Sequence, residues 1–456
     1  MYSRCAGTVV VVVLASFAAA FGGAACAEDR ETGASTPDGG ADAAAGITIV
    51  THVPVPGAVS PSGASGAVTG AKANATWAAF SADDGPWQDL SPIDVGTYVL
   101  GLPAARWVVA IVCANDDDAK SAVLVYRRTL ATRSLDVALA EQCTPFAGGD
   151  EFTLTGNITN APATTEWLDF GYARDSRGVA IPVPVGGSSP YELVGIVAGR
   201  WDLSFAVRDE PFRAPSRIVI RRDEAVTADR AADIDVMGPT SFVPGSKRFA
   251  LHAIGTGDSV QPMILYGAGG PLGIDLGPQD VPADQTDVAL VYSTVPEASQ
   301  RPTDRYHGDI RVQHDRRSDE RTIMFDLHAA IDLDLTLLPP LAAPRVTAIG
   351  GSPRVRLETR TGTMPNASAY EIRAVSSLNR RTEHVWRTSY DSASVGGASE
   401  IVDTMPDLSA LPGFRGAWSL PPGNGATVFV TAFEAPQPLG DGTLQRTTAT
   451  AASVVP

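Results

Sequence analysis

The sequence predicts an all-β protein made of serial sandwich-like domains behind an export signal and a flexible tether. Short runs of alternating apolar and polar residues recur along the chain, as half-buried antiparallel strands require. The 44 Gly and 34 Pro residues are spread throughout, where they would interrupt long helices but suit sandwich loops. Several segments also return after about 90 residues, which is the size of one sandwich domain.

Residues 1–25 have the features of a secretory signal peptide. Arg4 supplies the positive charge, an apolar run covers Thr8–Phe21, and small residues follow it. The uncharged stretch of residues 5–27 is also just long enough to span a bilayer as an uncleaved helical anchor. The small residues favour a cleavage site, so we expect the signal to be removed.

The segment Gly23-Ala24-Ala25-Cys26 resembles a bacterial lipobox, which implies lipidation of the Cys26 thiol and cleavage just before it. The alternative is an A-x-A site at Ala25-Cys26-Ala27, which would release a chain that starts at Glu28. Residues 26–45 are rich in Gly, Ala, Ser and Asp and should form a flexible tether. We therefore expect a lipoprotein anchored in the bacterial cell envelope, at the outer membrane or its periplasmic face, with secretion as the alternative.

Two cysteines, Cys113 and Cys143, lie in the region that should fold. An exported chain meets an oxidising compartment, so this pair predicts a disulfide within the first domain. Such a bond would add about 3 kcal/mol by restricting the unfolded chain. The alternative is two buried free thiols.

An internal repeat supports the domain division. The second copy of each repeated feature follows the first at a similar distance, and aliphatic-Asp-aliphatic segments close the units. The matched segments are Trp77–Phe80 with Trp167–Phe170, Arg106-Trp107 with Arg200-Trp201, and Val125–Arg128 with Val219–Arg222, and the closing segments are Leu135–Val137, Ile234–Val236 and a fainter Ile331–Leu333. Strands are thus expected at equivalent places in successive domains.

Pro/Gly-rich stretches divide the folded chain into β-sandwiches at residues 46–147, 148–238, 239–342 and 343–456. The last of these resembles a fibronectin type III module in its strand-like segments, Pro344–Ala348, Ala369–Val375 and Ala426–Phe433. As a whole, the chain resembles the multi-domain Ig-like exported lipoproteins of Gram-negative bacteria. That resemblance implies serial Ig-like sandwiches and carries no site residues.

The composition excludes one class of partner. A net charge of -16 argues against nucleic acid, because a phosphate backbone requires a basic surface. Arg127-Arg128 and Arg221-Arg222 are basic spots on this acidic background, and they fit pairing with nearby carboxylates.

No catalytic constellation stands out. The chain has no G-x-S-x-G elbow and no H-E-x-x-H motif, and its six histidines are scattered. His307–Asp309 with His314-Asp315 could hold zinc and Asn115–Asp118 could hold calcium, but solvated loops explain both. We expect no enzyme activity, no cofactor and no metal.

Five tryptophans bear on carbohydrate binding, since exposed rings on a sandwich can stack on sugars. Trp77 recurs as Trp167 and Trp107 recurs as Trp201, which predicts that these four rings pack in the cores. Trp87 has no counterpart and is expected to be available at the surface.

These observations favour a non-catalytic cell-envelope lipoprotein that acts as a binding, adhesion or structural interaction protein. Its expected partners are the membrane, through the lipid anchor, and an envelope protein or glycan. The alternative is an exported carbohydrate-binding or carbohydrate-processing protein. A third hypothesis is a subunit of an envelope assembly held by pairing of edge strands.

Overall fold

The structure is a computed structural model, and it is built almost entirely of strands. One four-residue helix, α1 (Ser392–Val395), and short 3-10 turns are the helical segments among the described residues. The predicted all-β class is confirmed. Within the described ranges, no helix is long and apolar enough to cross a membrane. The structure describes residues 46–53, 72–101, 105–139, 150–172, 175–180, 188–210, 213–269, 273–278, 281, 285–314, 319–349, 356–379, 382–421, 423 and 425–454.

The first sandwich has seven strands in two sheets. One sheet has the order β4-β1-β7, and the facing strands have the order β3-β2-β5-β6. The first and last strands, β1 and β7, pair in parallel. The strands are β1 (Ile47–His52), β2 (Trp77–Ala82), β3 (Gln88–Asp89), β4 (Thr97–Leu100), β5 (Arg106–Ala114), β6 (Lys120–Thr129) and β7 (Ser134–Ala138).

The second and third sandwiches repeat this strand order. Their sheets are β11-β8-β14 with β10-β9-β12-β13-β16, and β20-β17-β23 with β19-β18-β21-β22. The second consists of β8 (Glu151–Thr159), β9 (Trp167–Tyr172), β10 (Asp175–Ala180), β11 (Ser188–Val197), β12 (Gly199–Arg208), β13 (Arg217–Val226), β14 (Arg230–Ala231), β15 (Ile234–Asp235) and β16 (Ser241–Phe242). The third consists of β17 (Gly245–His252), β18 (Asp258–Gly267), β19 (Ile274–Asp275), β20 (Asp287–Thr294), β21 (Arg305–His314), β22 (Asp319–Leu327) and β23 (Leu333–Thr336).

The sequence echoes fall on equivalent strands. Trp77 and Trp167 both begin the second strand of their units, β2 and β9. The closing segment of the third sandwich lies two residues later than the sequence suggests. Phe249 pairs with Leu333, so β23 closes the unit on Leu333-Asp334-Leu335, and Ile331–Leu333 is not the third copy.

The fourth sandwich has a different order, with sheets β24-β25-β28 and β27-β26-β29-β31. The order of β31, β29 and β26 is the G-F-C order of immunoglobulin sandwiches, with β27 in the place of C′. The first three units share the sandwich architecture but not this strand order. The fourth consists of β24 (Arg345–Ile349), β25 (Arg356–Gly362), β26 (Ala367–Asn379), β27 (Thr382–Asp391), β28 (Glu400–Thr404), β29 (Ala426–Glu434), β30 (Gln437–Leu439) and β31 (Gly442–Val454).

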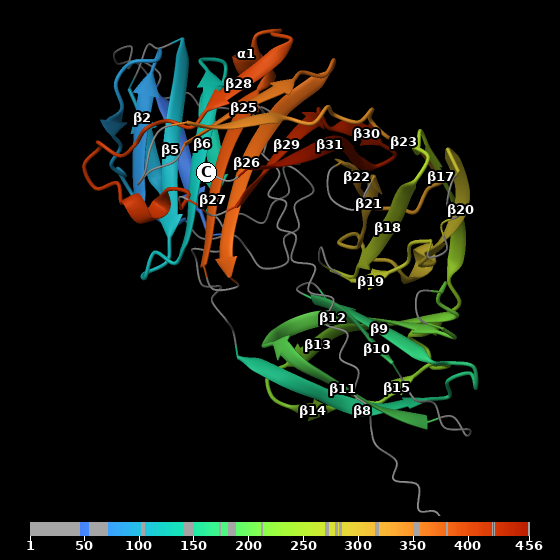
Figure 1. Ribbon diagram of the computed structural model, residues 1–456. Helices are drawn as coiled ribbons and strands as arrows, with labels where there is room; N and C mark the ends of the chain where they lie inside the picture. The colour runs from blue at the N-terminus through green and yellow to red at the C-terminus, as the bar shows by residue number, and fades with distance from the viewer. Residues whose placement is uncertain are drawn as a thin grey trace, which may run out of the picture.

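One continuous sheet joins three of the sandwiches. Strand β6 of the first pairs in parallel with β27 of the fourth, and β22 of the third pairs antiparallel with β31 of the fourth. The result is a 13-stranded sheet with the order β3-β2-β5-β6-β27-β26-β29-β31-β22-β21-β18-β19, and β30 attached to β31. Figure 1 shows the first, fourth and third sandwiches along one arc, in blue, orange to red, and yellow. We refer to this as the long sheet.

The small sheets of the first and fourth sandwiches cover opposite faces of the long sheet. Ala122 of β6 lies beside Val385 of β27 in the core of the first sandwich, whereas Val123 lies beside Trp386 in the core of the fourth. Strands β5 and β6 are therefore buried on both faces, which explains their nearly unbroken apolar sequences. Residues 405–420 help to cover the second face.

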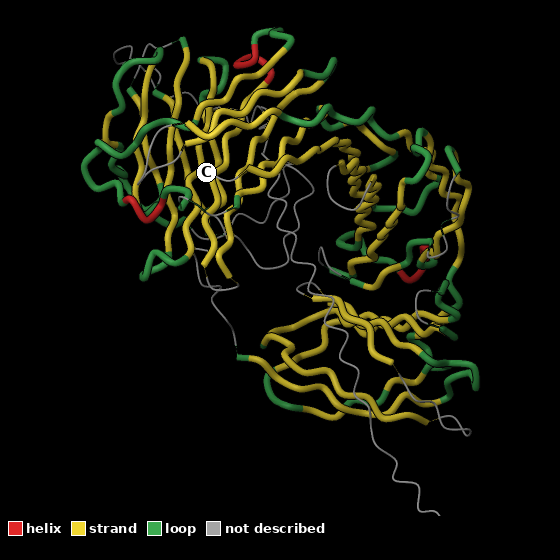
Figure 2. Tube along the Cα trace, viewed as in Figure 1, coloured by secondary structure: helices red, strands yellow, loops and turns green. Residues whose placement is uncertain are grey.

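The second sandwich docks on the third. Ala206, Ile218 and Ile220 from β12 and β13 belong to the core of the third sandwich. Arg222 of β13 donates hydrogen bonds of 2.6 and 2.9 Å to the carboxylate of Asp304, which is buried. The tube view shows the two layers of the second unit below the third (Figure 2).

Candidate functional site

The candidate site is the face of the long sheet that lies opposite the cores of the third and fourth sandwiches. Along β26, Tyr370, Ile372 and Ala374 pack in the core, so the alternate residues Glu371 and Arg373 lie on the other face. Strand pairing extends this face across six strands, β27, β26, β29, β31, β22 and β21. We call it the polar face. Its side chains include Arg387, Glu371, Arg373, Phe429, Thr431, Gln445, Thr447, Glu320, Thr322, Asp326, His307, Asp309 and Arg311.

Glu371 is the most unusual residue of the polar face. It is 6% exposed, and its Oε2 atom accepts no hydrogen bond. The nearest cation is Arg387, whose Nε lies 3.8 Å from that oxygen. Burial raises the pKa of Glu371 above its ordinary value, and the charges of Arg387 and Arg373 oppose the rise without cancelling it.

Two arginine–aromatic pairs flank Glu371. The guanidinium of Arg373 lies 5.1 Å from the centre of the Phe429 ring, within the range of a cation–π contact. Arg387 donates a 2.8 Å hydrogen bond from Nη2 to the hydroxyl of Tyr126, which belongs to the first sandwich. The polar face thus begins at the junction between the first and fourth units.

Two further polar side chains of this face have buried atoms without a hydrogen bond. Gln445 donates from Nε2 to the carbonyl of Glu434 at 3.3 Å, but its Oε1 accepts nothing. The Nδ1 atom of His307 lies 3.2 Å from Asp326 Oδ2, an ion-pair distance without hydrogen-bond geometry, and neither ring nitrogen has a hydrogen bond. Buried polar atoms nearly always have a hydrogen-bond partner, so the unpaired atoms of Glu371, Gln445 and His307 need an explanation.

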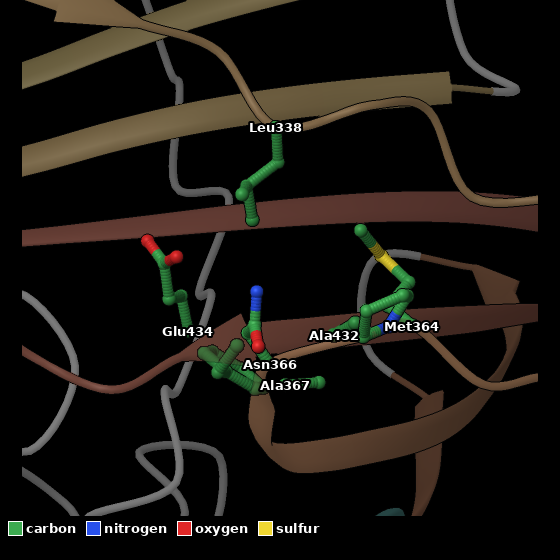
Figure 3. Close-up of a pocket in the computed structure, with 8 residues that line it drawn as sticks. Leu338, Met364, Asn366, Ala367, Ala432 and Glu434 are labelled. Carbon is green, nitrogen blue, oxygen red and sulfur yellow. The ribbon is translucent and has the colours of Figure 1, made fainter.

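Two small pockets lie at the fourth sandwich. Figure 3 shows one of them, bordered by Leu338, Met364, Asn366 and Glu434, with a volume of about 10 Å³. A second, beside Trp386 and under residues 405–409, has about 20 Å³. Each has room for roughly one water molecule. Neither therefore accommodates a larger ligand.

The predicted lipidation and disulfide residues lie mostly beyond what the structure describes. Cys26 and Cys143 are outside the described residues, as are the signal peptide and the tether. Cys113 lies on β5, 2% exposed, in the core of the first sandwich. The Cys113–Cys143 disulfide and the lipid anchor at Cys26 remain predictions.

The candidate zinc ligands are not brought together. His314 pairs with Asp258 at 2.9 Å, and His307 lies beside Asp326. Asp315 is outside the described residues. Among the residues that are described, no group of three or more His, Cys, Asp or Glu side chains could hold a metal ion.

The acidic hairpin that could have held calcium makes a contact within the chain. Asp118, in the left-handed backbone region with φ of 54°, accepts a 2.7 Å hydrogen bond from the Trp418 indole and a 3.0 Å bond from Arg415. These hydrogen bonds hold the pKa of Asp118 below its ordinary value, although burial opposes the shift. The hairpin of the first sandwich thus fastens the 405–420 segment of the fourth.

The tryptophans only partly follow the expectation. Trp107 is fully buried in the first core, but Trp77 is half-buried and faces the fourth sandwich, 5.3 Å from the Phe414 ring. Its expected packing in its own core is therefore wrong, because the 405–420 segment covers the outer face of β2 and β5. Trp87, expected to be available, packs partly buried against the same joint core. Trp167 and Trp201 are half-buried.

Sequence reasoning did not select the polar face. Its signal is present in Ala369-Tyr-Glu-Ile-Arg, where charged residues alternate with core residues on a predicted strand. Nothing in the sequence distinguishes Glu371 from an ordinary solvated glutamate. The pairing of β26 with β27 and β29, and of β27 with β6, determines its surroundings, and β6 and β29 are distant in the sequence.

Together these features define an all-β multi-sandwich protein that combines a continuous sheet with a polar candidate site whose side chains are buried or half-buried. No protein family matches the sequence, and no curated protein matches it. One solved structure with some likeness is a candidate carbohydrate-binding protein from Bacteroides uniformis, 12% identical, covering 46% of this chain and 98% of that chain. Its TM-score of 0.20 is too low to assign a fold or a function.

Proposed function

We propose that this chain is a non-catalytic lipoprotein of the bacterial cell envelope that binds a partner on the polar face of its long sheet. The lipid anchor at Cys26 and the export signal are inferred from the sequence. The observation that carries the proposal is the set of buried polar atoms without hydrogen bonds on one sheet face, at Glu371, Gln445 and His307. In native proteins each such atom requires an explanation, such as a functional role, local strain or a bound water or ion.

The continuous sheet also supports a binding role. Strand pairing fixes β26, β29 and β31 on both sides, so the side chains of the polar face are held in a constant arrangement. A rigid, preorganised surface loses little conformational entropy when it binds. Residues placed on strands are positioned more accurately than residues on loops.

The test combines localisation and envelope binding. Expressed in a Gram-negative host, the full chain should sit in the membrane fraction, with a mature N-terminus at a lipidated Cys26 by intact mass. Cys26→Ser should lose the lipid and become soluble. The soluble chain, added to isolated envelopes, should be retained, and it should be released when Glu371 and Gln445 are both replaced by Met.

The matched control for the binding arm is Glu192→Gln, on β11 of the second sandwich, where the side chain is exposed. This variant should be retained like the wild type. Either robust turnover of envelope glycans or peptides by the wild type, or retention that does not depend on the polar face, would overturn the proposal.

A further inference from the structure

Strand β20 of the third sandwich has an open outer edge. It pairs with β17 on one side, and the described residues place no strand on the other. In Figure 1 it lies at the rim of the unit, with β17 and β23 on its inner side. Its sequence contains no Pro, Gly, Lys or Arg, its single charged residue is Asp287, and Val291 is 63% exposed. An unprotected apolar edge of this kind recruits another strand.

The other edge strands among the described residues are shorter than β20 or carry features that discourage pairing. Strand β11 contains Pro190, Glu192 and a bulge. Strand β28 contains Glu400 and Asp403, and β4 and β23 have four residues each. Proline, charged side chains, bulges and short length are the means by which natural sheets protect their edges. Strand β20 has eight residues and lacks all of these protections except the charge at its first position.

The backbone groups that β20 presents at its open edge follow from its register. Ser293 donates its N–H to the carbonyl of Leu276 at 2.9 Å, so it points away from β17. Backbone groups of successive residues in a strand alternate in direction, so Asp287, Ala289 and Val291 also point away from β17. No described residue forms a backbone hydrogen bond with these three on that side. The open edge is therefore the segment Asp287–Val291.

A second copy of this segment is complementary to the first. Antiparallel pairing about a two-fold axis at Ala289 places Val291 of each copy opposite Asp287 of the other, with matching sheet faces. This arrangement forms about six backbone hydrogen bonds.

The charges at this edge also match those of a second copy. Arg248 of β17 pairs in register with Val291, is exposed, and has no ion-pair partner among the described residues. In the two-fold arrangement, Asp287 of the second copy lies two strand spacings from Arg248, about 9.6 Å between backbones, which an arginine side chain can bridge. Asp287 is exposed and already hydrogen-bonded to His252 at 2.7 Å, and a carboxylate can accept further bonds.

We propose that β20 forms a two-fold symmetric dimer by antiparallel pairing with β20 of a second copy. The small sheet of the third sandwich then continues across the two-fold axis into the same sheet of the second copy. Neither the polar face nor the lipid anchor takes part, so the dimer is independent of the proposed binding role. A single strand pair buries less area than a standard interface, so we expect a Kd on the order of 1–100 µM.

The experiment measures self-association of the soluble full chain, Cys26→Ser, by sedimentation velocity over concentrations that span this Kd. Ala289→Lys and Ala289→Glu should each weaken the dimer at least tenfold, because like charges then lie opposite each other at the two-fold axis. An equimolar mixture of the two variants should associate again, because a lysine then faces a glutamate. The matched control is Val99→Lys, at an exposed valine of the edge strand β4, which should keep the wild-type Kd.

Circular dichroism verifies that the variants are folded, which an exposed position such as Ala289 should permit. A wild-type chain that stays monomeric, or an Ala289→Lys variant that dimerises as tightly as the wild type, would overturn the proposal. Loss of the dimer in Val99→Lys alone would assign association to β4 and equally overturn it. The variant with Glu371 and Gln445 replaced by Met should dimerise like the wild type, so failure of the polar-face proposal and failure of the dimer are distinguishable.

Discussion

Arg222 holds the second and third sandwiches together through buried charges. Its guanidinium contacts both Asp304 and Asp202, and Asp304 also accepts a hydrogen bond from Tyr266. Burial would raise the pKa of Asp304, but the hydrogen bonds from Arg222 and Tyr266 lower it below its ordinary value. The carboxylate therefore stays ionised at neutral pH and depends on its arginine.

Arg222→Met should destabilise the protein by about 3–5 kcal/mol, because it leaves the Asp304 carboxylate buried without its counter-ion. The double variant Arg222→Met with Asp304→Leu should recover most of that loss. Urea unfolding followed by circular dichroism measures both. Arg213→Met, at an exposed pair, should change stability by less than about 1 kcal/mol. Equal effects at Arg222 and Arg213 would contradict the role assigned to this junction.

The polar face also shows the limit of sequence reasoning for single residues. The sequence identifies Glu371 as an outward residue of a strand, and the structure agrees that it lies opposite the core. Its burial, its raised pKa and its missing hydrogen bond depend on neighbours from β27, β29 and the first sandwich. The chemistry of the site therefore depends on contacts between strands, which the local sequence pattern does not reveal.

At the scale of single strands, β6, like β5, differs from the other strands of its unit because both of its faces are buried. Two consecutive residues of β6 are both buried. Val123 lies in the core of the fourth sandwich, and Leu124 lies in the core of the first sandwich. An ordinary sandwich strand would bury only one of two consecutive residues.

Leu124→Ala and Val123→Ala should therefore both be costly. We expect about 2–5 kcal/mol for Leu124→Ala and about 2 kcal/mol for Val123→Ala, from lost burial and the cavities left behind. Chemical denaturation of the purified variants measures these values. Glu192→Ala on β11, an alternating edge strand, should be neutral within about 0.5 kcal/mol. A neutral Val123→Ala would show that the second face of β6 is not packed.

Most strands were predictable because local periodicity sets them. The strand-like segments Ala369–Val375 and Ala426–Phe433 are found within β26 and β29. The unbroken apolar run of β6, Ala122–Tyr126, did contain a sign of double burial. The identity of the covering element was not predictable, since residues 405–420 reach it from the far end of the chain.

At the scale of the molecule, the fourth sandwich pairs with one strand edge of the first sandwich and with one strand edge of the third. Strand β27 covers the edge of β6, and β31 covers the edge of β22. Serial, independent domains were the natural expectation from linker composition. A sheet shared between units cannot be deduced from local pattern, because the pairing partners are separated by more than a hundred residues.

Removal of residues 343–456 should expose these two long edges and cause association. Exposed edges recruit other strands, so the shortened protein should form soluble oligomers or precipitate. Size-exclusion chromatography with light scattering measures the outcome. Removal of the predicted tether alone, residues 28–45, leaves every described strand in place and should leave the mass distribution unchanged. A monodisperse, folded monomer of the shortened protein would refute the shared-sheet dependence.

The pairing of β6 with β27 also constrains the order of folding. Ser121 and His384, hydrogen-bonded at 2.9 Å across this pair, are 263 residues apart in the chain. Contacts of such long range form slowly, because a large loop has to close first. During synthesis, the edges of β6 and β22 therefore remain unpaired until β27 and β31 have been made. The nascent chain should depend on holding chaperones for longer than four independent domains would.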